Sequence, residues 1–524
     1  MNKFLNYNSA KGSLNLSEKI GQLFMPAAFI NDTETEILKL EELIRNNGVG
    51  GLCFFHSRAS AATNYEGKKE VIFNADSFQT LQSLIQRYQK VSKYPLLIAI
   101  DAEWGLAMRI ENTPQYPYNI TLGAIQNSDN LIFEVGKNIG RDCKAAGIHW
   151  NLAPCVDINN NPNNPVIGYR SFGEDKIQVA KKALAFIKGT KSEGILTSIK
   201  HFPGHGDTAT DSHLGLPLIE KTKEELKKNE LYPFQKLIDE GVDAVMVGHL
   251  SVPALAGGKK ISSSISKDII KGLLRNEMGF KGVVISDALN MHAVSKNFPL
   301  QGELEWLAFD AGNDVLCFAE HVSEGIATIL ENATEAQIED SFQRVWKLKE
   351  KAMQAQESIA NSSSNSKPKT DALLLRKIAK KSLTLYAGSD ADIAAFRNTN
   401  FCTMTIKRSA ANYDSDEIRT NLKEMRSEVE QEKDILILLT PPQIKPVNNF
   451  GLLPDEIDFI NELILTKNVV LYLFGNPYLL NHLNITETAV IVAAYQDSIA
   501  FQNVATNHFL GKLKAIGKLP VTIN

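Results

Sequence analysis

The chain has 524 residues, more than one hydrophobic core ordinarily organises, so we expect two domains. With 44% hydrophobic and 22% charged residues, its composition is typical of a soluble globular protein. The 56 Lys and Arg residues nearly balance the 60 Asp and Glu residues, and the net charge of -4 argues against nucleic acid as a partner. No apolar run is long enough to cross a bilayer, so we expect no membrane partner either.

The N-terminal segment and the cysteines bear on the compartment. Residues 1–24 carry positive charge but lack the apolar stretch that forms the core of a signal peptide. Five scattered cysteines, an odd number without C-x-x-C spacing, fit reduced buried thiols better than a disulfide framework. Both features favour a cytoplasmic protein; the alternative is an exported protein whose signal was trimmed and replaced by a new Met. The cysteines are Cys53, Cys143, Cys155, Cys317 and Cys402.

Short β-type runs alternate with amphipathic stretches through residues 1–353. In the amphipathic stretches, apolar residues recur at spacings of three and four, which predicts helices. Eight strands, each followed by a helix, predict a (β/α)₈ barrel of the TIM type; a doubly wound open sheet is the alternative. The predicted strands are residues 22–27, 49–55, 96–101, 148–154, 196–201, 244–249, 283–287 and 314–318.

Residues 354–371 separate this part from a second one. They are rich in Ser, Asn, Lys and Pro without hydrophobic periodicity, which predicts a solvated linker. Residues 372–524 again have an α/β pattern, beginning with a helix at 373–381 and a strand at 382–386. The later apolar runs 434–439, 469–473 and 489–494 suit strands buried on both faces of a parallel sheet. No glycine-rich phosphate loop supports a nucleotide-binding fold.

Polar residues follow the predicted barrel strands at the ends where active sites of such barrels form. A terminal aspartate adds nothing to the packing of an apolar strand, although taken singly each one is explained by capping of the next helix. Five strand ends that converge on one rim are harder to explain by capping alone. These residues are Asp101, Asp157, Lys200 with His201, His249 and Asp287.

The segment after the fifth strand has three of the ten histidines within thirteen residues. His201 and His205 have the i,i+4 spacing of zinc ligands, but Pro203 and Gly204 between them exclude a regular helix, so we predict no metal site. Asp211 and His213 fit an acid/base pair better, because an imidazole titrates near neutral pH and a nearby carboxylate fixes its tautomer. The alternative for this pair is a structural hydrogen bond.

Several segments, in this order, resemble glycoside hydrolase family 3 and, within it, the bacterial β-N-acetylglucosaminidases. The strongest is KHFPGHGDTATDSHLGLP at residues 200–217, and GFKGVVISDALNM at 279–291 is similar to the family's nucleophile segment. IGQLF (20–24), NLAPCVDI (151–158) and RSFGED (170–175) extend the resemblance over nearly the whole first domain. LFGNPYLL (473–480) and GKLPVTI (517–523) resemble the family's C-terminal α/β sandwich domain.

The resemblance implies roles for individual residues. Asp287 matches the nucleophile, and His213 paired with Asp211 matches the acid/base. The family's D-x-E-G-G-R-V segment is here DAEWGLA, so Leu106 stands in place of the first arginine and Trp104 could add a stacking wall. No metal or organic cofactor is implied. The residues implied to bind the sugar are Asp101, Arg170, Lys200 and His201, with Arg109 where a second arginine is common.

The implied activity is that of a retaining exo-β-N-acetylglucosaminidase acting on an oligosaccharide or muropeptide that ends in N-acetylglucosamine. A β-glucosidase of the same family is one alternative, but those enzymes draw a glutamate acid/base from the second domain and lack the Asp–His pair. A phosphorylase is another, because a neutral imidazole repels phosphate less than a carboxylate does. A catalytically silent sugar-binding protein is the third, and the presence of every matched catalytic residue argues against it.

Overall fold

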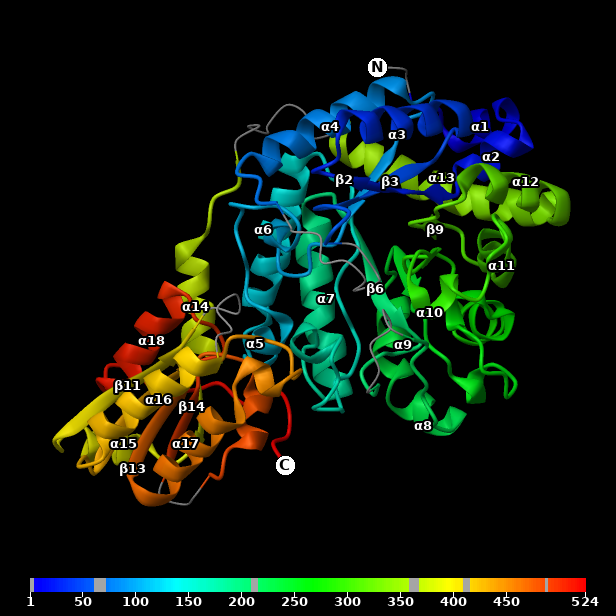
Figure 1. Ribbon diagram of the computed structural model, residues 1–524. Coiled ribbons are helices and arrows are strands. Elements are labelled where there is room, and N and C mark those ends of the chain that lie inside the picture. The colour runs from blue at the N-terminus through cyan, green and yellow to red at the C-terminus, as the bar shows by residue number, and fades with distance from the viewer. Residues whose placement is uncertain (1–3, 61–71, 209–214, 358–366, 409–414, 486–488) are drawn as a thin grey trace. The chain divides into compact units, whose positions relative to one another are not determined.

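The computed structural model describes residues 4–60, 72–208, 215–357, 367–408, 415–485 and 489–524 (Figure 1). They form two compact units: residues 1–116, 133–157 and 183–370 make the first, and residues 117–132, 158–182 and 371–524 make the second. Within the described ranges, no helix combines the length and the apolar character that crossing a membrane requires.

The strands of the first unit close into a ring. Seven of them form one parallel sheet in the order β2-β3-β4-β5-β6-β7-β8. Strand β1 (Phe24–Met25), which Pro26 separates from β2, pairs in parallel with β9 (Leu316–Cys317), and Val315 bridges Ile285 of β8. All eight predicted strands are therefore present, and the barrel is confirmed against the open sheet. The sheet consists of β2 (Ala27–Phe29), β3 (Gly51–Phe55), β4 (Leu97–Ile100), β5 (Trp150–Asn151), β6 (Leu196–Phe202), β7 (Ala244–Val247) and β8 (Val283–Ser286).

Each strand is followed by helical structure, as the alternating pattern predicts. The apolar residues of α4 (Ser77–Val91) are buried at positions 78, 81, 84, 85 and 88, which is the spacing of one helix face. The other principal elements are α3 (Glu34–Asn47), α6 (Asp129–Ala146), α7 (Lys176–Ser192), α8 (Lys223–Lys228), α9 (Leu231–Asp239), the π-helical η5 (Asp268–Glu277), α10 (His292–Ser295), α11 (Glu303–Ala311), α12 (Val322–Asn332) and α13 (Glu335–Glu357).

The second unit contains a five-stranded sheet of order β10-β14-β13-β12-β11, parallel except for the β10–β14 pair. The predicted strands correspond to β10 (Thr384–Ala387), β12 (Asp434–Thr440), β13 (Asn468–Leu473) and β14 (Val490–Ala493). Edge strand β11 (Phe401–Lys407) was not predicted, because exposed residues alternate with its buried ones and leave no continuous apolar run. Helices α14 (Ala372–Ser382) and α18 (Ile499–Phe509) lie side by side (Figure 1), and α15 (Asp390–Phe396), α16 (Ser415–Val429) and α17 (Pro454–Thr466) complete the unit.

The predicted linker overlaps ordered structure at its start. Helix α13 continues to Glu357, so residues 354–357 are helical, and residues 358–366 lie outside the described part of the chain. Helix α14 begins at Ala372, where the Asp371 side chain accepts a hydrogen bond from the Leu374 N–H at 2.9 Å. The predicted division into 1–353 and 372–524 also did not anticipate that residues 117–132 and 158–182 belong to the second compact unit.

A buried lysine of α13 makes stability depend on pH. Lys349 is fully buried and donates to Gln22 Oε1 at 2.5 Å, and burial lowers the pKa of its ammonium to about 7. Between that value and the unfolded-state pKa of about 10.4, the unfolded chain binds a proton that the folded chain has lost. The free energy of unfolding therefore rises with pH in this window, by up to about 1.4 kcal/mol per pH unit from this group.

We expect Lys349→Met to remove this positive slope, because methionine does not titrate. Urea unfolding at several pH values between 7 and 9 measures the slope directly. Lys347→Met is the matched control, since Lys347 is exposed on the same helix and its loss should leave the slope unchanged. Equal slopes in wild type and Lys349→Met would contradict the assignment.

Candidate active site

The polar strand ends of the first unit do gather at the carboxyl-terminal rim of the barrel. Asp101 follows β4, Lys200 and His201 lie in β6, His249 comes after β7, and Asp287 follows β8 directly. Because all these strands are parallel, their carboxyl ends meet at one edge of the ring. The predicted convergence is confirmed.

Asp101 is held between two cations. Lys200 Nζ lies 2.7 Å from one of its carboxylate oxygens, and the Arg109 guanidinium donates to the other at 2.8 Å. Lys200 Nζ also lies 2.8 Å from Glu103 Oε1, and the side chains of Lys200 and Glu103 are only 3% and 1% exposed. Burial alone raises the pKa of Asp101, but the charges of Lys200 and Arg109 outweigh it and bring the pKa well below its ordinary range. Asp101 is therefore an ionised acceptor, fixed at both oxygens.

A tight turn brings Arg109 back to Asp101. Gly105 has a φ of 98°, and a Cβ added there would lie 2.8 Å from the Pro114 carbonyl oxygen, so only glycine fits this position. The 3₁₀ helix η1 (Leu106–Met108) follows and ends at Arg109, whose guanidinium carbon lies 5.1 Å from the centre of the Phe55 ring. Leu106, which departs from the family pattern, is buried.

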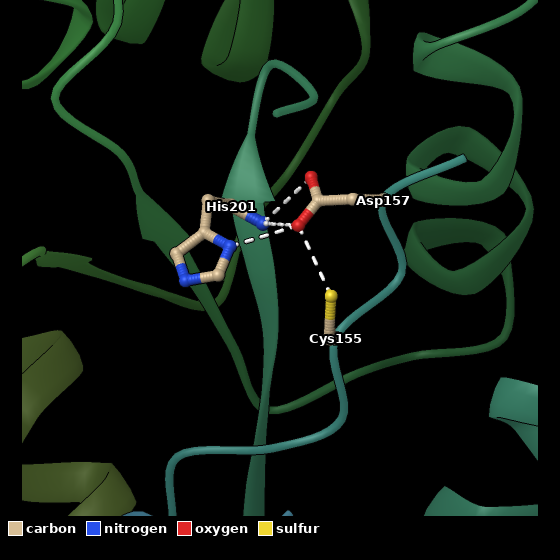
Figure 2. A group of neighbouring side chains, drawn as sticks. All are labelled: Cys155, Asp157 and His201. Carbon is tan, nitrogen blue, oxygen red and sulfur yellow. Dashed lines mark hydrogen bonds and ion pairs between the residues drawn. The ribbon is translucent and has the colours of Figure 1, made fainter. Parts of the chain in front are cut away.

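Asp157 organises the start of the segment after β6 (Figure 2). Its fully buried carboxylate accepts the His201 N–H at 3.2 Å and the His205 N–H at 2.7 Å. It also accepts from His201 Nδ1 at 2.8 Å and from Cys155 Sγ at 3.1 Å. Burial raises the pKa of Asp157, and the imidazoles of His201 and His205 with the His205 N–H reverse this to a net lowering. Because an ionised carboxylate only accepts, Nδ1 of His201 carries a proton, and Nε2 is the acceptor nitrogen of the neutral ring.

Asp287 is a half-buried carboxylate near two imidazoles and the ammonium of Lys200. Its Oδ1 accepts the Ala288 N–H at 2.8 Å. Burial raises the pKa of Asp287, but the imidazoles of His249 and His201, the Ala288 N–H and the ammonium of Lys200 lower it below its ordinary value. The side chain is therefore ionised at neutral pH, as a carboxylate nucleophile must be.

His249 fixes the peptide that follows Asp287. Its Nε2 lies 2.9 Å from the Ala288 carbonyl oxygen, and its Nδ1 lies 2.8 Å from Ser264 Oγ. A carbonyl oxygen only accepts, so Nε2 carries a proton. The sequence identified His249 and Asp157 as polar strand ends but gave neither a role, because the bonds that define their roles join segments far apart in the chain.

The predicted acid/base residues, Asp211 and His213, lie outside the described residues. The flanks of their segment are anchored. On one side Thr208 Oγ1 bonds His205 Nδ1 at 2.8 Å, and on the other the Ser251 N–H donates to the Pro217 carbonyl at 2.8 Å. Lys221 joins the two flanks, because its ammonium lies 2.5 Å from Asp207 and 2.7 Å from Glu230.

Arg170 and the pair of His201 and His205 were also considered from the sequence. Arg170 belongs to the second unit, where it ends η2 (Gly168–Arg170) and donates to the Val166 carbonyl at 3.4 Å, and its role as a sugar ligand stays a prediction. His201 and His205 do not share a helix: their rings contact edge to face with centres 5.8 Å apart, and each Nδ1 has its own partner.

A parallel (β/α)₈ barrel with ionised carboxylates and buried cations at its carboxyl-terminal rim has the organisation of a barrel enzyme. Residues 15–348 match the family model described as "Glycosyl hydrolase family 3 N terminal domain". The chain therefore belongs to glycosyl hydrolase family 3, and the resemblance deduced from its motifs is confirmed.

Relatives within the family are named as hexosaminidases. The chain is 34% identical over 352 residues to Beta-hexosaminidase A of Pseudoalteromonas piscicida, covering 62% of this chain and 56% of that protein. It is 31% identical over 293 residues to a Beta-hexosaminidase of Tolumonas auensis, covering 55% and 80%. The solved structure of a glycoside hydrolase family 3 β-N-acetylglucosaminidase from Paenibacillus sp. str. FPU-7 aligns over 98% of this chain and 99% of that one, with 27% identity and a TM-score of 0.78. The matched region spans only about half of the Pseudoalteromonas relative (56%) and of a Cellulomonas fimi relative (51%).

We expect Asp157→Asn to reduce kcat/KM for an aryl glycoside by about 10²-fold, the scale of a small misplacement in an active site. An amide cannot accept from the His201 ring and from both backbone N–H groups as an ionised carboxylate does. Asp239→Asn, at an exposed position of α9, is the control and should retain wild-type activity. Thermal unfolding of both variants separates loss of positioning from loss of fold. Wild-type kcat/KM in folded Asp157→Asn would show that the carboxylate has no positioning role.

Proposed function

We propose that this protein is a retaining exo-β-N-acetylglucosaminidase that removes terminal β-linked N-acetylglucosamine. The observation that carries the proposal is Asp287, an ionised carboxylate at the end of β8 whose pKa is lowered by the nearby imidazoles of His249 and His201 and by Lys200. The names of the hexosaminidase relatives and of the aligned Paenibacillus structure support the choice of sugar.

The proposed mechanism is a double displacement. Asp287 attacks the anomeric carbon, the bond to the leaving oxygen breaks, and His213 gives that oxygen its proton. In the second step His213 takes a proton from water, the water oxygen attacks the anomeric carbon, and Asp287 leaves as a carboxylate. Asp211 would hold the imidazole in the required tautomer and stabilise its charged form.

The sugar would be oriented by the groups around Asp101. Asp101 is an ionised acceptor for hydroxyl groups, and Lys200 and Arg109 are donors whose charges it already balances. His201 would present Nε2 to the sugar, because Nδ1 is bonded to Asp157. Arg170 stays a predicted further ligand, implied by the family pattern alone. The scheme requires no metal ion and no organic cofactor.

Replacement of the nucleophile is the central test. Asp287→Asn should abolish turnover, because a neutral amide cannot displace the leaving group, and it should leave the circular dichroism spectrum unchanged. A 2-fluoro aryl glycoside should accumulate as a covalent ester on wild type, and peptide mass spectrometry should locate it on Asp287. An ester on another carboxylate would overturn the assignment.

The acid/base is tested by the dependence on the leaving group. A nitrophenolate departs without a proton, whereas a sugar leaving group needs one, so His213→Ala should slow hydrolysis of a disaccharide far more than that of an aryl glycoside. The expected loss on the disaccharide is about 10²–10⁴-fold. Asp211→Asn should act in the same direction but less, since the imidazole remains.

Azide provides the matching control, because an anion attacks the glycosyl-enzyme without losing a proton. It should accelerate His213→Ala on activated substrates and yield a β-glycosyl azide. Equal losses on both substrate types without azide rescue would make His213 a binding or structural residue, and the acid/base would then be sought among glutamates of the second domain.

Two further assays concern which sugar is removed and whether water or phosphate accepts it. We expect aryl N-acetylglucosaminide to be cleaved faster than the glucoside or xyloside, although a Cellulomonas fimi relative named "Beta-N-acetylglucosaminidase/beta-glucosidase" justifies including the glucoside. Release of free sugar, unchanged by added phosphate, is expected of a hydrolase. Formation of a sugar phosphate would instead identify a phosphorylase. Muropeptides and chitin oligosaccharides would then be compared as natural substrates.

A further inference from the structure

We propose that Cys155, Asp157 and His201 form an inhibitory zinc-binding site beside the catalytic rim. The three side chains are buried, and one ligand atom from each lies within 4.8 Å of the other two. Cys155 and Asp157 come from the segment after β5, and His201 comes from β6, so two neighbouring elements of the barrel supply the site (Figure 2).

The donor set and its spacing fit zinc. A thiolate, an imidazole nitrogen and a carboxylate oxygen are common zinc ligands, and three of them leave a fourth tetrahedral position for water. Asp157 Oδ2 lies 2.8 Å from His201 Nδ1 and 3.1 Å from Cys155 Sγ. Zinc bonds of about 2.0–2.3 Å would place such donors roughly 3.3–3.6 Å apart. The two donor pairs that share Asp157 Oδ2 therefore need to separate by only about half an ångström, and His201 Nδ1 and Cys155 Sγ already lie within 4.8 Å of each other.

Both protons that zinc would replace point at the same oxygen. Oδ2 of Asp157 accepts from Cys155 Sγ and His201 Nδ1, whereas Oδ1 is held by the His205 N–H at 2.7 Å. Zinc could thus take the place of two hydrogen bonds at Oδ2 while the backbone still orients the carboxylate through Oδ1. The Cys155 proton would go to solvent, and a neutral His201 ring would move its proton from Nδ1 to Nε2. Zn²⁺ with one thiolate and one carboxylate has no net charge, which favours binding in a buried place.

Inhibition follows from that tautomer change, and this step alone rests on the proposed function. With Nδ1 bonded to Asp157, the neutral His201 ring offers an acceptor at Nε2. With Nδ1 bound to zinc, Nε2 carries the proton and becomes a donor. A sugar hydroxyl that donates to His201 would lose its acceptor, so zinc should weaken substrate binding.

Direct metal binding is the test that does not depend on activity. Zn²⁺ is titrated against a chromophoric chelator, and Co²⁺ is added to the metal-free protein to detect the thiolate-to-cobalt charge-transfer band. We expect one zinc ion per chain and a cobalt band in wild type. Cys155→Ser keeps a hydrogen-bond donor to Asp157 but removes the thiolate, so it should lose the band and bind zinc at least tenfold more weakly. Cys402→Ser, at the half-buried cysteine of the second unit, is the matched control and should behave as wild type.

Activity is then measured with aryl N-acetylglucosaminide at increasing Zn²⁺, each variant being compared with its own zinc-free rate. The zinc concentration for half inhibition should rise at least tenfold in Cys155→Ser and stay unchanged in Cys402→Ser. A wild-type protein without a cobalt band, or zinc affinity that is equal in wild type and folded Cys155→Ser, would overturn the proposal. The wild-type cobalt spectrum decides the matter even if Cys155→Ser does not fold.

Discussion

The carboxylate of Asp157 is the interaction on which the rest of the site depends. It accepts two backbone N–H groups, from His201 and His205, in a place where neither the carboxylate nor the amides are exposed. Buried N–H groups without an acceptor cost about 1–3 kcal/mol each, so this carboxylate fixes the path of the chain as it leaves β6. The same group sets the tautomer of His201. One carboxylate, that of Asp157, therefore determines both the backbone conformation after β6 and the tautomer of the His201 side chain.

Charge pairing explains how so many ionised groups are stable at the rim. A buried cation is tolerated only where partners surround it, and Lys200 has both Asp101 and Glu103 within 2.8 Å. These pairs are fixed by strands and a short 3₁₀ helix, so their fields are directed at the site before any ligand arrives. Such preorganised charges stabilise a transition state without the cost of reorienting water. The charged side chains of Asp101 and Lys200 are therefore held by regular secondary structure or directly beside it.

The sequence predicted the barrel well because most of its strands are short apolar runs ended by a polar residue. Strand β11 escaped this pattern, since only Met404 and Ile406 of its residues are buried. Their positions at strand ends and in family motifs predicted that Asp101, Lys200, His201 and Asp287 lie together, and the structure places them at one rim. The roles of Asp157 and His249 could not be predicted, because each depends on bonds to a distant backbone group or hydroxyl. Contacts of that kind leave no periodicity in a sequence.

The protonation states of the rim also limit where an acid/base can be. A carboxyl group that donates a proton near neutral pH needs a raised pKa. Among the described carboxylates, Asp101, Asp157 and Asp287 all have lowered pKa values, because neighbouring cations and N–H groups outweigh their burial. The interactions that keep Asp287 ionised therefore make Asp101, Asp157 and Asp287 unsuited to donate a proton. Under the proposed mechanism the acid/base comes from outside these three residues, which favours His213, six positions after the Asp207 carboxylate that Lys221 binds.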